Sequence, residues 1–185
     1  MLASAGIAVT VVPADVDEPA LRGAMQASDP QIRPAAIAAE LAHAKAEQVS
    51  SLYPAALVIG SDQVLSCEKQ LHDKPADLDG AKASLLALRG RVHELCSSVA
   101  LAESGRVVWA DTDTARLTMR EFSASFLDHY IAEAGDRICS SVGAYQLESL
   151  GIQLFERIEG NHFTILGMPL LALLAELRKR GLIAA

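Results

Sequence analysis

The sequence lacks most of the features that mark secreted, membrane-bound or nucleic-acid-binding proteins. Its three cysteines are scattered, without the spacing of a metal site or a disulfide framework. No apolar run approaches the ~20 residues that cross a bilayer, and no basic segment precedes an apolar core at the start, so we expect neither membrane nor signal peptide. The net charge is −7 without a dense Lys/Arg stripe, which argues against long nucleic acids as partners. We expect a cytoplasmic protein, and a small anionic ligand stays open because a few lysines suffice to bind one.

The apolar pattern predicts alternating strands and helices. A length of 185 residues suits one or two small domains with a sizeable core, and we expect a single domain over residues 1–185. We expect strands at 7–13, 57–59, 92–102, 107–119, 152–158 and 163–165, and helices at 31–50, 78–88, from 123 onward and at 170–180. Asp77 is a predicted helix cap, and Ser104-Gly105 predicts a hairpin between two long strands. This order indicates an α/β fold with an antiparallel middle.

The most informative stretch is the apolar run at 55–59 followed by Gly60-Ser61-Asp62-Gln63. The run is typical of a buried strand. Gly60 and Ser61 are expected to break it and to leave Asp62 at its carboxyl end, where ligands sit in open α/β sheets. A carboxylate there can take a proton from water or hold a divalent cation. The residues alone leave a second interpretation open, in which Asp62 caps the turn that follows.

Three further charged residues have two interpretations each. Glu18 stands in an acidic turn after the first predicted strand, as a solvated acid or as a site residue. Lys45 lies four residues after Leu41, close to the apolar row of its helix, so its ammonium either snorkels or points into a cleft. Lys74 precedes a proline that stiffens the backbone, and it is either a surface lysine or a point charge for phosphate.

Several motifs in fixed order resemble the Maf family, from about residue 3 to residue 180. They are Gly60-Ser61-Asp62-Gln63-Val64, Lys74-Pro75, Leu88-Arg89-Gly90-Arg91-Val92-His93, Val142-Gly143-Ala144-Tyr145, Phe155-Glu156-Arg157-Ile158-Glu159-Gly160-Asn161 and Ile165-Leu166-Gly167-Met168-Pro169-Leu170. Maf proteins are cytoplasmic nucleoside triphosphate pyrophosphatases, related to the inosine triphosphatases. The resemblance implies a mixed, twisted α/β sheet with flanking helices and two lobes around a cleft.

The resemblance also implies a reaction and a role for each candidate residue. The reaction is hydrolysis of a nucleoside triphosphate to the monophosphate and pyrophosphate. Asp62 matches the catalytic proton acceptor, and Lys45 and Lys74 match active-site lysines that compensate phosphate charge. Glu18 matches an acid near the metal, so Glu18 and Asp62 are the expected ligands of Mg²⁺ or Mn²⁺. A homodimer is the assembly that the resemblance suggests.

Two positions bear on the substrate. The family branch that acts on thymidine and uridine triphosphates usually has Thr after the catalytic Asp and Gln after the Gly-Ala-Tyr motif, whereas this chain has Gln63 and Glu148. This pair is more similar to the branch acting on 7-methylguanosine triphosphate, although Gly143-Ala144-Tyr145 looks more like the pyrimidine branch. A carboxylate can accept two hydrogen bonds from a guanine edge and attract a cationic methylated ring. The alternative is that Glu148 is an ordinary acid on a helix surface.

One part of the family pattern is missing from this sequence. Maf proteins normally begin with a strand and a loop of the type Ala-Ser-x-Ser-x-x-Arg, which binds phosphates. Residues 1–6 resemble instead the end of the following helix, so we expect the first strand and the loop to be absent and neighbouring strand edges to be unpaired. Two hypotheses follow: a metal-dependent pyrophosphatase, with guanine-type substrates favoured, or a catalytically impaired nucleotide-binding regulator of cell division with the same fold.

Overall fold

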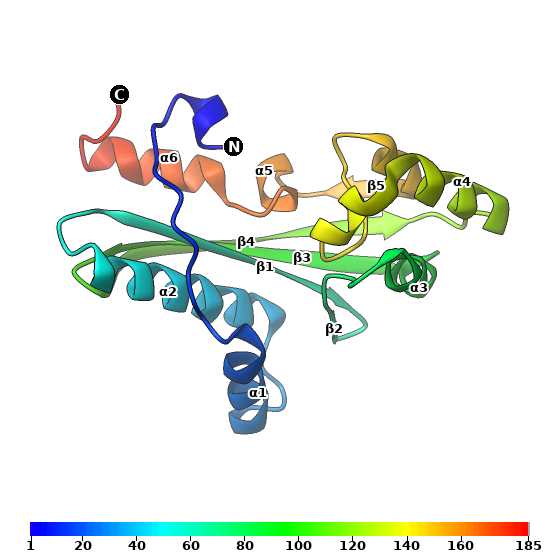
Figure 1. Cartoon of the computed structure of the whole chain (residues 1–185), viewed down its shortest axis with the longest axis horizontal. Coiled ribbons are helices and arrows are strands. Elements are labelled where there is room, and N and C mark those ends of the chain that lie inside the picture. Colours follow the sequence, from blue (N-terminus) through cyan, green and yellow to red (C-terminus); the bar gives the residue numbers. More distant parts are fainter. Residues whose placement is uncertain (185) are drawn as a thin grey trace.

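The computed structural model describes residues 1–184, and a five-stranded sheet runs through its centre (Figure 1). The strands lie in the order β2-β1-β3-β4-β5, and their bounds are β1 Val58–Cys67, β2 Gln70–His72, β3 Val92–Glu103, β4 Arg106–Met119 and β5 Phe155–Glu159. The expected α/β class, with helices flanking a sheet, is confirmed. All pairings between the described strands are antiparallel, whereas a mixed sheet was expected. Tight turns join β1 to β2 and β3 to β4, and such turns can connect only antiparallel neighbours.

Helices cover both faces of the sheet and its far end (Figure 1). Their bounds are α1 Glu18–Ser28, α2 Pro34–Leu52, α3 Leu78–Leu88, α4 Ala124–Ala134, α5 His162–Ile165 and α6 Leu170–Lys179, with 3-10 turns η1 Ala3–Ala5, η2 Gly135–Ser140 and η3 Leu150–Leu154. Side chains alternate between the two faces of each strand. Cys96 and Ala100 of β3 therefore pack under α2, whereas Val99 and Leu101 pack under α6. A larger cluster around Leu95 joins the sheet to α3, α4 and η2.

The contact between α2 and β1 corrects the interpretation of Gly60. We expected Gly60 to end a strand, but β1 continues through it to Cys67, so Asp62 lies in the middle of a strand. Gly60 instead allows close packing, because a Cβ atom there would lie 2.6 Å from the carbonyl oxygen of Ala42 and 2.7 Å from the backbone nitrogen of Ala46. Ala42, Ala46 and the facing Ala100 are buried, so small side chains let the helix lie directly on the sheet.

The segment at 7–13 is not the strand that its β-branched residues suggested. Residues 8–14 make no backbone–backbone hydrogen bond within residues 1–184, and Val11 is 86% exposed. The first half of β1, residues 58–64, pairs with β3 on one side and with no described strand on the other. A cavity of about 610 Å³ lies between this edge and residues 8–14. The expected unpaired edge is therefore present, and the segment does not pair with it because the cavity lies between them.

Some of the other predicted helix and strand boundaries are confirmed by the structure, and others are not. Asp77 accepts a hydrogen bond from the backbone of Gly80 at 2.8 Å and opens α3 as predicted, and Ser123 caps α4 in the same way. The hairpin at Ser104-Gly105 is confirmed, with both residues at positive φ. Residues 163–165, expected as a strand, belong to the short helix α5, which Asn161 caps through its side chain. Helix α1 was not predicted.

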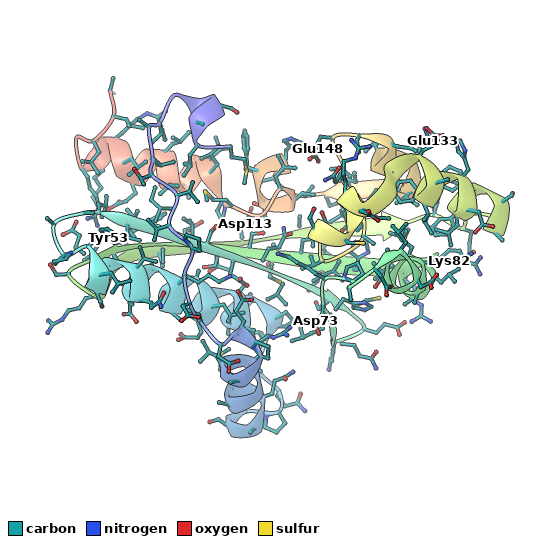
Figure 2. The ribbon with its side chains drawn as sticks, in the orientation of Figure 1. Tyr53, Asp73, Lys82, Asp113, Glu133 and Glu148 are labelled. Atoms are coloured by element: carbon teal, nitrogen blue, oxygen red, sulfur yellow. The ribbon has the colours of Figure 1, made fainter. Side chains whose placement is uncertain are left out.

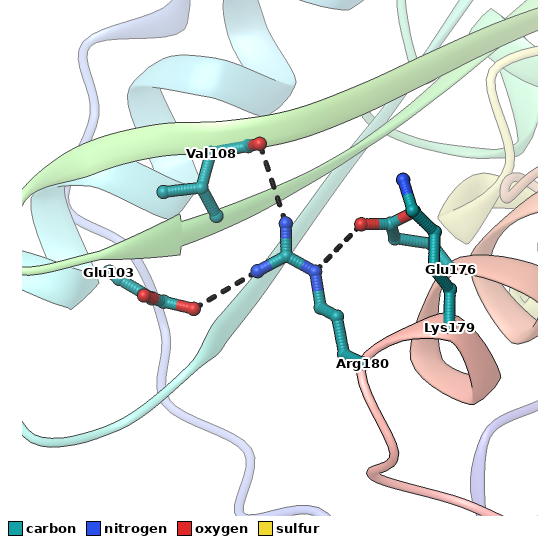
Figure 3. A network of polar contacts seen from close by, with 5 residues as sticks. All are labelled: Glu103, Val108, Glu176, Lys179 and Arg180. Carbon is teal, nitrogen blue, oxygen red and sulfur yellow. Dashed lines mark hydrogen bonds and ion pairs between the residues drawn. The ribbon is translucent and has the colours of Figure 1, made fainter.

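The C-terminal end of α6 is fixed to the turn end of the β3–β4 hairpin (Figure 3). Arg180 donates to Glu176 Oε1 at 2.7 Å and to Glu103 Oε1 at 3.1 Å, and it also reaches the carbonyl oxygen of Val108. This network holds α6 over the apolar face formed by Val99 and Leu101. None of the helices in residues 1–184 combines the length and the apolar character that crossing a bilayer requires.

Candidate active site

The four predicted catalytic and metal-binding residues line one cavity of about 560 Å³. Asp62 comes from β1, Lys45 from α2, Glu18 from the first turn of α1 and Lys74 from the segment after β2. These residues are far apart in the sequence, and the hairpin and the two helices bring them together. The wall is completed by residues of the 140–142 and 166–167 segments.

Lys45 is the centre of the charged cluster. Its Nζ donates to Asp62 Oδ1 at 2.6 Å and lies 2.7 Å from Glu18 Oε1. The side chain of Asp62 is 8% exposed, whereas that of Glu18 is 44% exposed, so one partner lies inside and the other at the rim. Of the two interpretations of Lys45, the structure shows the one in which its ammonium points into a cleft.

The pKa values of Asp62 and Lys45 are both raised, although burial and pairing act in opposite directions on each residue. Burial raises the pKa of the Asp62 carboxyl above its ordinary value, and the hydrogen bond from Lys45 offsets only part of this effect. Burial alone would lower the pKa of Lys45, but its hydrogen bonds to Asp62 and Glu18 raise the pKa overall. Asp62 is therefore a carboxylate with more than ordinary affinity for a proton, held in place by a cation.

The first turns of α1 place Glu18 in the cavity together with Arg22, a residue that the sequence did not reveal. We placed Glu18 in a turn, but it is the first residue of α1, and Asp17 caps this helix by accepting from the backbone of Ala20 at 2.9 Å. One turn further, Arg22 reaches the same cavity and pairs with Asp73. The signal was available in the sequence, because a capping Asp followed two residues later by Pro19 is a typical helix start.

A smaller cavity of about 110 Å³ adjoins the charged one. Gln63, Ser141, Val142 and Leu166 line both, so the two cavities adjoin. Glu148 lines the smaller cavity from the turn between η2 and η3, and it is not on a helix surface (Figure 2). Of the two residues predicted to bear on the substrate, Gln63 thus lines both cavities and Glu148 lines only the smaller one.

The sheet edge separates the two cavities. Asp62 and Gln63 are consecutive in β1 and point to opposite faces. Asp62 faces α2 and Lys45, whereas Gln63 faces α5, where its side-chain nitrogen donates to the carbonyl oxygens of Thr164 and Ile165. Because the edge of β1 is unpaired at this point, a ligand can extend around it from one face to the other.

The predicted metal ligands can contribute to a Mg²⁺ or Mn²⁺ site without forming a complete one. Within residues 1–184 no group of three or more His, Cys, Asp or Glu side chains is placed to hold a metal ion. Mg²⁺, however, is commonly bound by one or two carboxylates together with substrate phosphates, and the carboxylates of Glu18 and Asp62 converge on one point at Lys45. The charged side chains of the cavity also balance, as three acids and three bases: Glu18, Asp62 and Asp73, and Arg22, Lys45 and Lys74. A highly charged anion would therefore need a further cation.

Comparison with known proteins adds an independent line of observation. The model of the family described as Maf-like protein matches residues 1–180. The chain is 54% identical to a nucleoside triphosphate pyrophosphatase of Paramagnetospirillum magneticum, over 98% of this chain and 92% of that protein. It is 50% identical to a 7-methyl-GTP pyrophosphatase of Mesorhizobium japonicum, over 99% and 91% of the two chains. A nucleoside triphosphate pyrophosphatase of Granulibacter bethesdensis is 49% identical over 97% of this chain and 90% of its own. With a family match over nearly its whole length and relatives at about half identity, the chain belongs to the Maf-like protein family.

Proposed function

We propose that the protein hydrolyses nucleoside triphosphates to the monophosphate and pyrophosphate. The observation that carries this proposal is the convergence of Asp62, Lys45, Glu18 and Lys74 on one cavity that adjoins a second. The names of relatives at 46–54% identity, nucleoside triphosphate pyrophosphatase and 7-methyl-GTP pyrophosphatase, support the same reaction. The three free cysteines suit the reducing cytoplasm. A homodimer stays a prediction from the resemblance.

Asp62 is the proposed general base. Its raised pKa suits it to take a proton from water, whose oxygen then attacks phosphorus while the anhydride between the α and β phosphates breaks. Pyrophosphate leaves with the electron pair of the broken bond. Lys45 holds the carboxylate in position, and Lys74 and Arg22, on the same cavity wall, stabilise the negative charge that accumulates on the phosphate oxygens.

We propose that Mg²⁺ or Mn²⁺ binds together with the substrate, at Glu18 and Asp62. The balanced charges of the cavity support this, because a triphosphate brings several negative charges that the protein alone does not neutralise. When bound, the cation would supply charge neutralisation on the phosphates. The two carboxylates already converge on a single cation, the ammonium of Lys45, at 2.6 and 2.7 Å.

The second cavity is the proposed nucleobase site. The triphosphate would lie on the α2 face beside Asp62, and the base would lie on the α5 face beside Gln63 and Glu148. The two carboxylate oxygens of Glu148 can accept from a guanine edge, which presents its N1–H and its amino group. A carboxylate also attracts the cationic ring of 7-methylguanine. We therefore favour guanine-type substrates such as 7-methyl-GTP over dTTP and UTP.

Replacement of the proposed base tests the function directly. Purified wild-type protein is assayed for pyrophosphate release from a panel of triphosphates with Mg²⁺, with Mn²⁺ and with EDTA. Asp62→Asn keeps the shape of the side chain but accepts no proton, so turnover should fall by at least about a hundredfold, the usual scale of general-base catalysis. Asp79→Asn, at an exposed position of α3, is the matched control and should turn over normally.

The possible results separate the two hypotheses. Turnover that requires a divalent cation and is lost only in Asp62→Asn supports the enzyme. Nucleotide binding without turnover in the wild type would favour the non-catalytic regulator. Equal activity of wild type and Asp62→Asn, with both folded by circular dichroism, would remove Asp62 from the mechanism.

A further inference from the structure

Three residues stand in a row across the face of the sheet that lies under α5. Gln63 of β1 is the register partner of Ser97 in β3, and Ser97 is the partner of Asp113 in β4. Residues paired directly across antiparallel strands point to the same face. The row therefore crosses the sheet from the unpaired edge of β1 to β4, and Figure 2 shows Asp113 midway along the length of the sheet.

The row fixes α5 through hydrogen bonds. Ser97 donates to the carbonyl oxygen of Thr164 at 2.7 Å, and the hydroxyl of Thr164 donates to Asp113 Oδ2 at 2.6 Å. Both Ser97 and Thr164 are fully buried. Asp113 is itself oriented, because its other carboxylate oxygen accepts from the backbone of Thr114 at 2.9 Å. Buried bonds of this kind are costly to break, since each leaves an unpaired polar group.

These bonds determine which way the Gln63 amide faces. Gln63 Nε2 lies 2.9 Å from Ser97 Oγ, 2.9 Å from the Thr164 carbonyl oxygen and 3.0 Å from the Ile165 carbonyl oxygen. The two carbonyls can only accept, and Ser97 has already given its proton to Thr164. All three neighbours are acceptors, so only the nitrogen end of the amide can occupy this place.

The oxygen end of the amide is consequently left for the cavities. Gln63 Oε1 accepts no hydrogen bond from residues 1–184, and it is not one of the buried polar atoms that lack a partner, which belong to His43 and His93. Gln63 lines both cavities at the point where they join. An acceptor of fixed direction thus stands at the entrance to the smaller cavity, which Glu148 also lines.

We propose that Ser97, Thr164 and Asp113 are positioning residues that hold the Gln63 side-chain amide with its oxygen toward the nucleobase cavity. The row makes this oxygen a preformed acceptor for a base that presents a donor. The part concerning substrate preference rests on the proposed function. The orientation of the amide does not depend on turnover and can be measured separately.

Hydrogen exchange of the Gln63 side-chain amide tests the orientation in the whole chain. In ¹⁵N-labelled protein the Gln63 signal is identified by its loss in Gln63→Met, and we expect exchange at least about tenfold slower than for the exposed Gln70, as hydrogen bonding protects amide protons. Ser97→Ala removes one of the three acceptors and the anchor of the Thr164 carbonyl, so it should lower this protection measurably, although the carbonyl of Ile165 remains a partner. Ser98→Ala is the matched control, because Ser98 is equally buried but points to the opposite face. Rapid exchange in the wild type, or equal protection in Ser97→Ala, overturns the proposal.

Steady-state kinetics tests the consequence for the substrate. In Ser97→Ala, KM for 7-methyl-GTP should rise roughly tenfold, about the value of one hydrogen bond, with kcat nearly unchanged and with a smaller rise for UTP, because uracil presents one donor, its N3–H, where guanine presents a pair. Thr164→Val should act in the same direction, and Thr164→Ser, which keeps the hydroxyl, should restore the preference. A parallel loss for both nucleotides would indicate a merely structural role and overturn the proposal. A wild type that protects Gln63 but hydrolyses nothing would leave the orientation standing and reject the proposed function.

Discussion

At the scale of single residues, the site depends on one ammonium group shared by two acids. Lys45 contacts both Asp62 and Glu18, so removal of either acid leaves the ammonium one partner, whereas removal of the lysine leaves two carboxylates facing each other. The buried member of the pair, Asp62, would suffer most, because an unpaired charge in a protein interior is costly. The resting site therefore keeps its base ionised by means of its own cation.

Glu148 gives the sharpest test of the nucleobase assignment. Glu148→Gln keeps the size of the side chain and removes its charge, so the ratio of kcat/KM for 7-methyl-GTP to that for UTP should fall roughly tenfold, the scale of a charge-assisted hydrogen bond. Glu156→Gln, on the exposed side of β5, is the control and should leave the ratio unchanged. If the rates for both nucleotides change by the same factor, Glu148 does not read the base.

At the scale of elements, the position of the site is fixed by how closely α2 lies on β1. Lys45 projects from α2 and Asp62 from β1, and the small residues between these elements determine the distance that their ion pair spans. A change in that distance acts on stability and on the site at once.

Gly60→Ala tests this close packing. The new methyl group would meet the backbone of Ala42 at 2.6 Å, so we expect the free energy of unfolding in urea to fall by about 2 kcal/mol, as in other overpacked cores. Gly23→Ala in α1 is the matched control, because nothing lies within 4 Å of its Cβ and alanine favours helix. A Gly60→Ala protein as stable as the wild type would mean that α2 withdraws freely, and the contact would lose its proposed importance.

The sequence predicted elements well where the signal is local. The caps Asp77 and Ser123 gave the starts of α3 and α4, and the two long runs around Ser104-Gly105 gave β3 and β4. It failed where three-dimensional neighbours decide. Residues 7–13 have strand-like composition but lie across a cavity from the β1 edge and do not pair with it. Gly60 has the composition of a strand break, but its lack of a side chain allows α2 to pack closely over it. For the candidate site, the motifs pointed to Asp62, Lys45, Glu18 and Lys74 but not to Arg22 on the same cavity, and Ser97 and Thr164 are ordinary residues whose contact exists only in three dimensions.

At the scale of the whole molecule, a buried histidine links the sheet to the segments around the smaller cavity. His93 of β3 is 1% exposed, its Nε2 lies 2.8 Å from the hydroxyl of Tyr145, and its ring contacts Phe155 of β5. Burial lowers the pKa of His93 from 6.5 to about 4. The folded protein therefore holds this ring neutral at pH values where an unfolded chain would bind a proton.

This difference predicts a dependence of stability on pH. Because the folded pKa is the lower one, the contribution is complete above pH 6.5 and is lost as the pH falls toward about 4, by on the order of 3 kcal/mol. The measurement is the free energy of unfolding in urea between pH 7 and 4.5. The double variant His93→Phe, Tyr145→Phe removes both polar partners and should show a shallower slope, while the carboxylates contribute equally to both proteins. Identical slopes would exclude His93 as the cause.

The equal number of acids and bases around the charged cavity has a consequence for which ions bind in the cavity. Because the opposite charges of the lining cancel in number, the cavity has no net charge with which to attract small anions such as chloride and orthophosphate. Only an anion that is long enough to contact several of these charged groups at once, and that brings its own counter-ion, would bind there favourably. Discrimination against small inorganic anions would then follow from the charge balance of the cavity itself.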